Sequence, residues 1–174
     1  MCQHKKVMHT MTSFRLVALL IFCSVLGAAH ARLGDTEAEL VKRFGEPTLR
    51  STHSIFAQGK RREMGPVLYF KQEDWSISCD LVDGRCMRIS YSKPGDWSED
   101  QIQLVLSTNS QGAAWTETSK LSIAKLQRTW RRSDGSTAEW FKNRSMDLVW
   151  NAYNVAKKKL EEQAKVEGMK KPKI

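Results

Sequence analysis

The chain has 174 residues, 41% of them hydrophobic, and a formal net charge of +9. Three cations lie within residues 1–31, and residues 157–174 hold seven lysines against three glutamates, so the body between them is close to neutral. This distribution argues against a nucleic-acid partner, because nucleic acid is bound through clustered lysine and arginine side chains.

The first 31 residues have the pattern of a signal peptide. Basic residues lie before and within an apolar run at 14–26, and Ala29-His30-Ala31 is a small-x-small cleavage sequence. An uncleaved anchor is the alternative, but the run is shorter than the roughly 20 apolar residues that span a bilayer. We therefore expect residues 1–31 to be removed by cleavage near Ala31, and the protein to be secreted or periplasmic.

A short helix is predicted directly after this leader. Thr36 and Glu39 have the spacing of a capping box, in which each side chain binds the backbone amide of the other residue. An apolar helical stripe follows, and Gly45 with Pro47 ends it, since glycine favours the helix C-terminus and proline prevents continuation.

The same residues carry a resemblance to known proteins. The pattern G-x-T-x-x-E-L at 34–40, followed by G-x-P at 45–47, resembles the SmpA/OmlA-type envelope proteins and the β-lactamase-inhibitor-like fold. The resemblance implies a small exported α+β protein that acts by binding another protein. The chain departs from the outer-membrane lipoproteins of this kind because it lacks their lipid-anchored cysteine.

Strands are expected next, at 48–58 and 66–71, on either side of a basic turn at 59–65. This turn either contacts an anion or a partner, or is simply solvated. Apolar residues at alternate positions on both sides of Asp83-Gly84 then predict a β-hairpin over 75–91.

Cys79 and Cys86 are the two cysteines that follow the leader, and an exported protein usually oxidises such a pair. A three-residue loop at 82–84 places Cys79 opposite Met87 and turns Cys86 to the other face of the hairpin. A four-residue loop places Cys79 opposite Cys86, where a disulfide fits. An oxidising compartment favours the disulfide, and the apolar pattern of the hairpin opposes it. The sequence therefore leaves both the disulfide and the free thiols open.

The second half of the chain resembles the first in outline. Ser98 and Gln101 form another capping box before a helical stripe. A second hairpin is predicted over 126–141, with a three-residue loop at Ser133-Asp134-Gly135, and a last strand at 146–150.

These elements predict the fold class. Residues 32–156 are expected to form one α+β domain with an antiparallel sheet of six to seven strands and two short capped helices. The halves 33–92 and 96–150 suggest a tandem repeat, with one continuous sheet as the simpler description. A longer helix is predicted at 151–168 from its apolar stripe, followed by a frayed tail at 169–174.

Few residues are candidates for catalysis or metal binding. His53 is the only histidine after the leader, and it has no nucleophile pattern or second metal ligand near it, so a packed or solvent-facing side chain is expected. No motif indicates a metal or cofactor. The carboxylates Glu73, Asp74, Asp80 and Asp83 cluster around the first hairpin, but spacing alone does not place two of them across a cleft.

Six tryptophans point to binding, because Trp and Arg are enriched in interface hot spots. Four of them are expected in the core: Trp75, Trp115, Trp130 and Trp150. The predicted binding residues are Arg128, Arg131, Arg132, Trp140 and Trp97, the two tryptophans being expected to lie exposed. In the predicted register Arg128 opposes Trp140 and stacks on it as a cation–π pair.

Three functions follow from these patterns. The first is an exported, non-catalytic binding protein with a protein partner and no cofactor. The second is an envelope hydrolase that uses Asp80 or Asp83. The third is a structural envelope accessory whose basic C-terminus makes weak contact with an anionic surface.

Overall fold

The computed structural model describes residues 32–119 and 126–169. The predicted leader 1–31 and the tail from 170 lie outside these residues. The described chain forms an eight-stranded antiparallel sheet with three helices, an α+β arrangement. The helices are α2 (Glu37–Phe44), α3 (Glu99–Thr108) and α4 (Asn151–Met169). The strands are β1 (Leu49–Ala57), β2 (Lys60–Gln72), β3 (Trp75–Val82), β4 (Arg85–Ser92), β5 (Trp115–Glu117), β6 (Gln127–Arg132), β7 (Thr137–Phe141) and β8 (Ser145–Val149).

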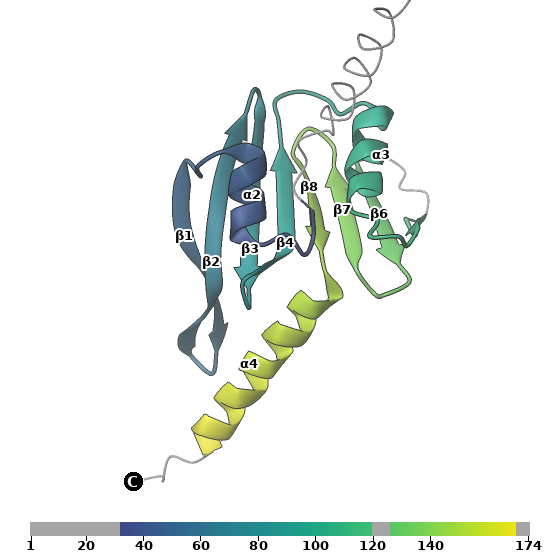
Figure 1. Ribbon diagram of the computed structural model, residues 1–174. Helices are drawn as coiled ribbons and strands as arrows, with labels where there is room; N and C mark the ends of the chain where they lie inside the picture. The colour runs from purple at the N-terminus through teal and green to yellow at the C-terminus, as the bar shows by residue number, and fades with distance from the viewer. Residues whose placement is uncertain (1–31, 120–125, 170–174) are drawn as a thin grey trace, which may run out of the picture.

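The sheet has a symmetric strand order, β1-β2-β3-β4-β8-β7-β6-β5. Each half is one helix followed by four strands, and the halves join where β4 pairs with β8 (Figure 1). The two descriptions that the sequence suggested therefore apply together: the helices and strands occur in a repeated order, and they form one continuous sheet. The strand count of six to seven was too low.

The bounds of the β1–β2 hairpin also differ from the prediction. Residues 60–65, predicted as part of a basic turn, belong to β2, and the chain reverses at Gln58-Gly59 instead. Both of these residues have positive φ, 52° and 71°, which suits a two-residue hairpin turn. Sequence reasoning missed the turn because glutamine is an uncommon residue in this conformation.

The two predicted capping boxes are present. Thr36 N–H donates to Glu39 Oε2 at 2.7 Å while Glu39 N–H donates to Thr36 Oγ1 at 3.3 Å. Ser98 and Gln101 make the same pair of bonds at 3.1 and 3.2 Å. These bonds satisfy backbone amides that the first helical turn leaves without partners.

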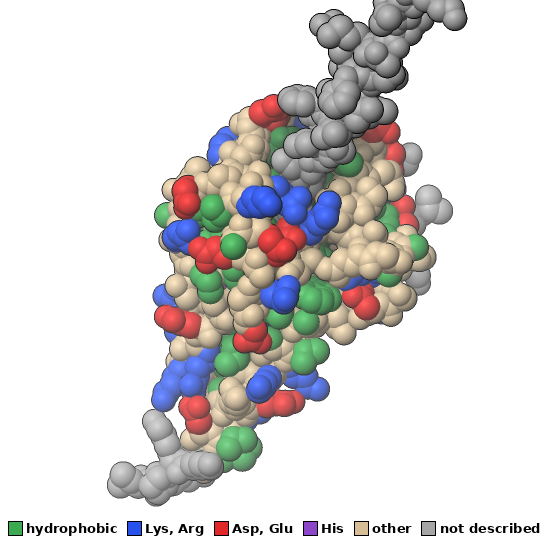
Figure 2. Space-filling view, viewed as in Figure 1, with side chains coloured by type: hydrophobic (Ala, Val, Ile, Leu, Met, Phe, Trp, Pro, Cys, Tyr) green, Lys and Arg blue, Asp and Glu red, His purple; other side chains and the backbone are tan. Residues whose placement is uncertain are grey.

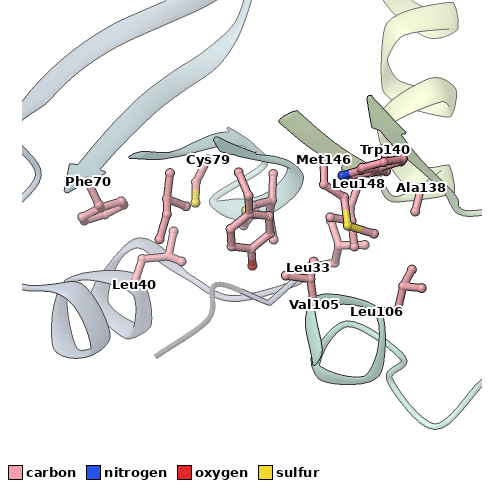
Figure 3. Packing of buried hydrophobic residues seen from close by; sticks show 14 of the residues in the cluster. Leu33, Leu40, Phe70, Cys79, Val105, Leu106, Ala138, Trp140, Met146 and Leu148 are labelled. Atoms are coloured by element: carbon pink, nitrogen blue, oxygen red, sulfur yellow. The ribbon is translucent and has the colours of Figure 1, made fainter. Parts of the chain in front are cut away.

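The main core lies between α2, α3 and one face of the sheet. Figure 3 shows Leu40 of α2 beside Phe70 and Cys79, and Val105 of α3 below Met146 and Leu148. The cluster runs without interruption across both halves, so the described residues share one core.

The 75–91 hairpin has neither of the two predicted registers. Its turn is the two-residue Asp83-Gly84, with φ of 51° and 74°, and a bulge between Asp80 and Leu81 shifts the pairing by one residue. Met87 is thereby turned away from the main core and belongs to a second apolar cluster instead. A bulge of this kind leaves no clear sequence signal, because it needs only one extra residue.

The bulge also decides the positions of the cysteines. Cys79 pairs with Ile89 and Cys86 with Leu81, so both thiols lie fully buried in the main core. They are not joined by a disulfide. Burial raises the pKa of the Cys86 thiol well above its usual range, and a hydrogen bond with Cys79 adds to this. The structure therefore has two neighbouring free thiols.

Helix α4 follows β8 directly and runs below the strands in Figure 1. Its buried side packs on the face of the sheet opposite the main core. Its Tyr153 joins Ile55, Met64, Val82 and Met87 in a second, smaller apolar cluster, with Ala156 and Leu160 of the predicted stripe packed against it. None of the helices within 32–119 and 126–169 is long and apolar enough to cross a membrane.

Candidate functional site

The face of the sheet opposite α2 and α3 carries rows of polar side chains. Cross-strand pairing places Tyr69 beside Ser78, Ser78 beside Ser90, and Ser90 beside Asp147. The neighbouring row places Asp80 beside Arg88. These residues alternate along their strands with the apolar residues of the main core, so the whole row lies on one face.

Two adjoining hollows lie on this polar face, with volumes of about 480 and 440 Å³. The first is bordered by Tyr69, Asp80 and Ser90, and the second by Asp147 and Tyr153. Together they form an open groove whose size is typical of ligand sites.

Five side chains at the junction of the two hollows form what we term the sheet-face site: His53, Asp80, Arg88, Asp147 and Tyr153. They come from four strands and α4. The hydroxyl of Tyr153 and Nε2 of His53 are 2.7 Å apart, within hydrogen-bond distance. His53 Nδ1 lies 3.4 Å from Asp80 Oδ2 on its other side. The imidazole thus joins the start of α4 to the floor of the groove.

Arg88 lies between two aspartates. Its guanidinium nitrogens are 3.8 Å from Asp80 Oδ2 and 3.8 Å from Asp147 Oδ2. The side chain of Asp80 is only 9% exposed, and its Oδ2 is a buried atom that accepts no hydrogen bond within the described part of the chain. Asp147 Oδ1 is likewise a buried atom that accepts no hydrogen bond from the described residues.

Burial raises the pKa of the Asp80 carboxyl, and the charges of Arg88 and His53 oppose this shift. Burial also raises the pKa of the Tyr153 phenol, so this hydroxyl is neutral near pH 7. A neutral phenol is a weak nucleophile. Across the described ranges, no group of three or more His, Cys, Asp or Glu side chains is placed to hold a metal ion. The geometry is that of a hydrogen-bonding site.

A larger hollow of about 680 Å³ lies between α4 and the strands β2, β3 and β4. Its walls include Met64, Val82, Met87 and Leu160, which belong to the cluster that anchors α4. None of the described residues that line it has a buried polar side-chain atom without a hydrogen bond, so it resembles a packing groove more than a recognition site.

Three of the five predicted binding residues are buried, which corrects the expectation that they form a surface. Trp97 and Trp140 are 7% and 8% exposed and belong to the main core. Trp97 packs edge-on against Trp75, with ring centres 4.8 Å apart. Arg132 is 2% exposed. A tryptophan next to a turn is expected to be exposed, but strand alternation turns Trp140 of β7 inward, and Trp97 enters the core from the loop before α3.

Arg128 and Arg131 lie nearer the surface. The three-residue loop is confirmed and Arg128 does oppose Trp140, but its guanidinium stacks on Trp130, 4.8 Å from the ring centre, instead of on Trp140. Arg128 also binds Glu99 and Glu117, which lowers the pKa of Glu117 to about 2. Arg131 is exposed. A binding role for these two arginines stays a prediction.

The four carboxylates near the first hairpin are not brought together. Glu73 and Asp74 lie in the β2–β3 turn, Asp83 lies in the β3–β4 turn at the opposite end of β3, and Asp80 is buried in the groove. Sequence reasoning did single out Asp80, but it missed Arg88, Asp147 and Tyr153. The available signal was the alternation of Ser76, Ser78 and Asp80 with apolar residues, which marks a polar sheet face.

On the opposite face of the sheet, the described side chains form no surface patch of a single charge sign (Figure 2). Figure 2 shows acidic and basic side chains interspersed over the face that carries α2 and α3. No protein-family model matches the sequence, and no curated protein or solved structure is similar enough to count as a match.

Proposed function

We propose that this chain is an exported, non-catalytic binding protein that holds its ligand in the groove of the sheet-face site. The observation that carries the proposal is the buried Asp80 Oδ2 in the open groove. It accepts no hydrogen bond from the described residues, although His53 Nδ1 and Arg88 lie 3.4 and 3.8 Å from it. A buried acceptor without a partner costs free energy of about 1–3 kcal/mol. A ligand that donates a hydrogen bond there recovers this cost on binding.

Two sequence expectations support the same function. The leader pattern at 1–31 predicts export, and the pattern at 34–47 resembles families that act by binding. The hydrolase alternative uses carboxylates near the first hairpin, and the separation of Asp80 from Glu73, Asp74 and Asp83 in the structure gives it no added support. The accessory role of the basic C-terminus stays a prediction.

Site-specific photo-crosslinking tests the proposal. A benzophenone amino acid replaces Tyr69, which borders the groove and is 38% exposed, or Leu104 on α3, which is 41% exposed and serves as the matched control. Each variant is irradiated in the exported fraction of the source organism and analysed by mass spectrometry.

We expect a defined adduct from position 69, none from position 104, and loss of the adduct when Asp80→Asn is added. Equal labelling at both positions, or none at position 69, would contradict the assignment of the groove.

A further inference from the structure

The groove contains hydrogen-bond acceptors and donors that are incompletely paired with each other. Asp80 Oδ2 and Asp147 Oδ1 are buried and accept no hydrogen bond from the described residues. Arg88 lies between the two carboxylates, but at 3.8 Å it is too far from either for a hydrogen bond. A ligand that completes this arrangement must donate to carboxylates and accept from a guanidinium at neighbouring positions.

This requirement discriminates between classes of ligand. An ammonium or guanidinium group satisfies the carboxylates but is repelled by Arg88, and by Lys157 at the edge of the second hollow. A phosphate or carboxylate satisfies Arg88 but is repelled by Asp80 and Asp147. An uncharged hydroxyl both donates and accepts, so adjacent hydroxyls can bind an aspartate and Arg88 together.

The rest of the groove also suits a polyhydroxylated ligand. Ser51, Thr52, Ser78 and Ser90 border the first hollow and supply further hydroxyl groups. Tyr69 and Phe56 border it too and are 38% and 80% exposed. An exposed ring of this kind offers an apolar surface on which the C–H face of a sugar ring packs.

Taking these features together, we infer that the ligand is a neutral oligosaccharide, bound through adjacent hydroxyls to Asp80, Arg88 and Asp147 with a ring packed on Tyr69. The inference rests on the proposed binding function and names its ligand class. Two joined hollows accommodate more than one sugar ring. A folded protein partner fits less well, because such interfaces have an apolar centre that is depleted in charged residues.

The test uses residues 32–174 on a printed array of neutral, anionic and cationic glycans, followed by isothermal titration calorimetry with the neutral oligosaccharide that gives the strongest signal. We expect saturable binding of at least one neutral glycan. Asp80→Asn and Asp147→Asn should each weaken it at least tenfold, because each replaces one acceptor oxygen by a donor. Tyr69→Ala should also weaken it.

Asp83→Asn is the matched control. It removes a carboxylate from the same hairpin, but at an exposed turn outside the polar row, and it should leave the affinity unchanged. Far-UV circular dichroism confirms that each variant is folded.

The other outcomes overturn the inference in distinguishable ways. No neutral-glycan binding on the array, together with a protein adduct from position 69, contradicts the ligand class and leaves the binding function in place. Preference for anionic or cationic glycans also contradicts the class. Glycan binding that survives both aspartate substitutions contradicts the site. No glycan binding and no adduct contradict the inference and the proposed function alike.

Discussion

Arg132 illustrates how burial changes the role of a residue that sequence alone assigns to a surface. Its guanidinium pairs with Asp134 at 2.6 Å and donates to the backbone carbonyls of Asn109 and Ser110 at 2.6 and 3.2 Å. It also lies 5.2 Å from the centre of the Trp115 ring. One side chain therefore ties the second hairpin to the end of α3.

We expect Arg132→Ala to lower the free energy of unfolding by about 3–5 kcal/mol, because it leaves buried acceptors and a carboxylate without their donor. The measurement is urea unfolding followed by tryptophan fluorescence. Arg131→Ala, at the exposed neighbouring position, should change stability by no more than about 0.5 kcal/mol. Equal effects of the two substitutions would contradict a structural role for Arg132.

Asp80 should make the protein less stable than it would be with a neutral side chain. Its pKa is raised in the folded state, so the folded chain holds this proton more tightly than the unfolded chain does. The carboxylate then lowers stability above the folded-state pKa, and the penalty is absent below the unfolded value of 3.8. A destabilising group retained in a groove is expected of a binding site.

Asp80→Asn should therefore raise the free energy of unfolding at pH 7 by about 0.5–2 kcal/mol, the usual range for stabilising substitutions. The gain should disappear at pH values below 3.8, where the aspartate is protonated in both states. Urea unfolding at the two pH values measures this difference. A variant that is less stable than the parent at pH 7 would show that attraction to Arg88 outweighs burial.

The buried thiols lead to a separate prediction about reactivity. Because burial raises the pKa of Cys86, its reactive thiolate is scarce at pH 8. Iodoacetamide should label the folded chain at least about 100-fold more slowly than the urea-unfolded chain, since labelling needs an opening that costs several kcal/mol. When residues 32–174 are used, mass spectrometry should find both Cys79 and Cys86 modified after unfolding without reductant. No modification under those conditions would reveal a disulfide instead.

At the scale of elements, local sequence signals predicted what local physics determines. The capping boxes at Thr36 and Ser98, the apolar stripe of α4 and the loop at 133–135 involve neighbours a few residues apart, and the structure has all of them. The bulge before Leu81 was not predictable in this way, because it depends on how β3 pairs with the rest of the sheet.

The candidate site was harder to predict for the same reason. His53 and Tyr153 are 100 residues apart in sequence and meet only because α4 turns back over the first half of the sheet. Asp80 was recognised as a candidate, but its partners His53 and Arg88 lie on β1 and β4, and Arg88 reaches Asp147 on β8. The pairing of β4 with β8 across the halves was not foreseen. No spacing pattern encodes a contact of this range.

The docking of α4 leads to the element-scale prediction. Tyr153 is 7% exposed and anchors the helix both through the second cluster and through His53. Tyr153→Ala should weaken this docking by about 3 kcal/mol, in the range for large-to-small substitution of a buried aromatic. Hydrogen exchange should then speed up within 151–169 while β2 and β3 keep their protection.

Val155→Ala provides the control for this measurement, since Val155 lies on the same helix but is 62% exposed. It should leave exchange in α4 unchanged. A uniform increase of exchange over the whole chain after Tyr153→Ala would show that α4 is part of the global folding unit and cannot open by itself.

At the scale of the whole molecule, the strand order raises the question of whether the two halves are separate folding units. They have the same order of elements, which is the arrangement expected of a duplicated unit. However, β4 and β8 pair over five residue positions, and the residues behind this seam belong to one uninterrupted core. The shared core predicts that neither half unfolds alone.

Leu148 tests that prediction because it lies at the seam, opposite Ile89 of β4 and Ala138 of β7, and is fully buried. Leu148→Ala should lower the free energy of unfolding by about 2–5 kcal/mol. If the core is shared, the loss should appear equally in the most protected amides of β3 and of β7 by native-state hydrogen exchange. Urea unfolding should remain a single transition by both fluorescence and circular dichroism. If the halves are independent, amides of β7 alone will exchange faster and a second transition will appear, because Leu148 belongs to the second half by sequence.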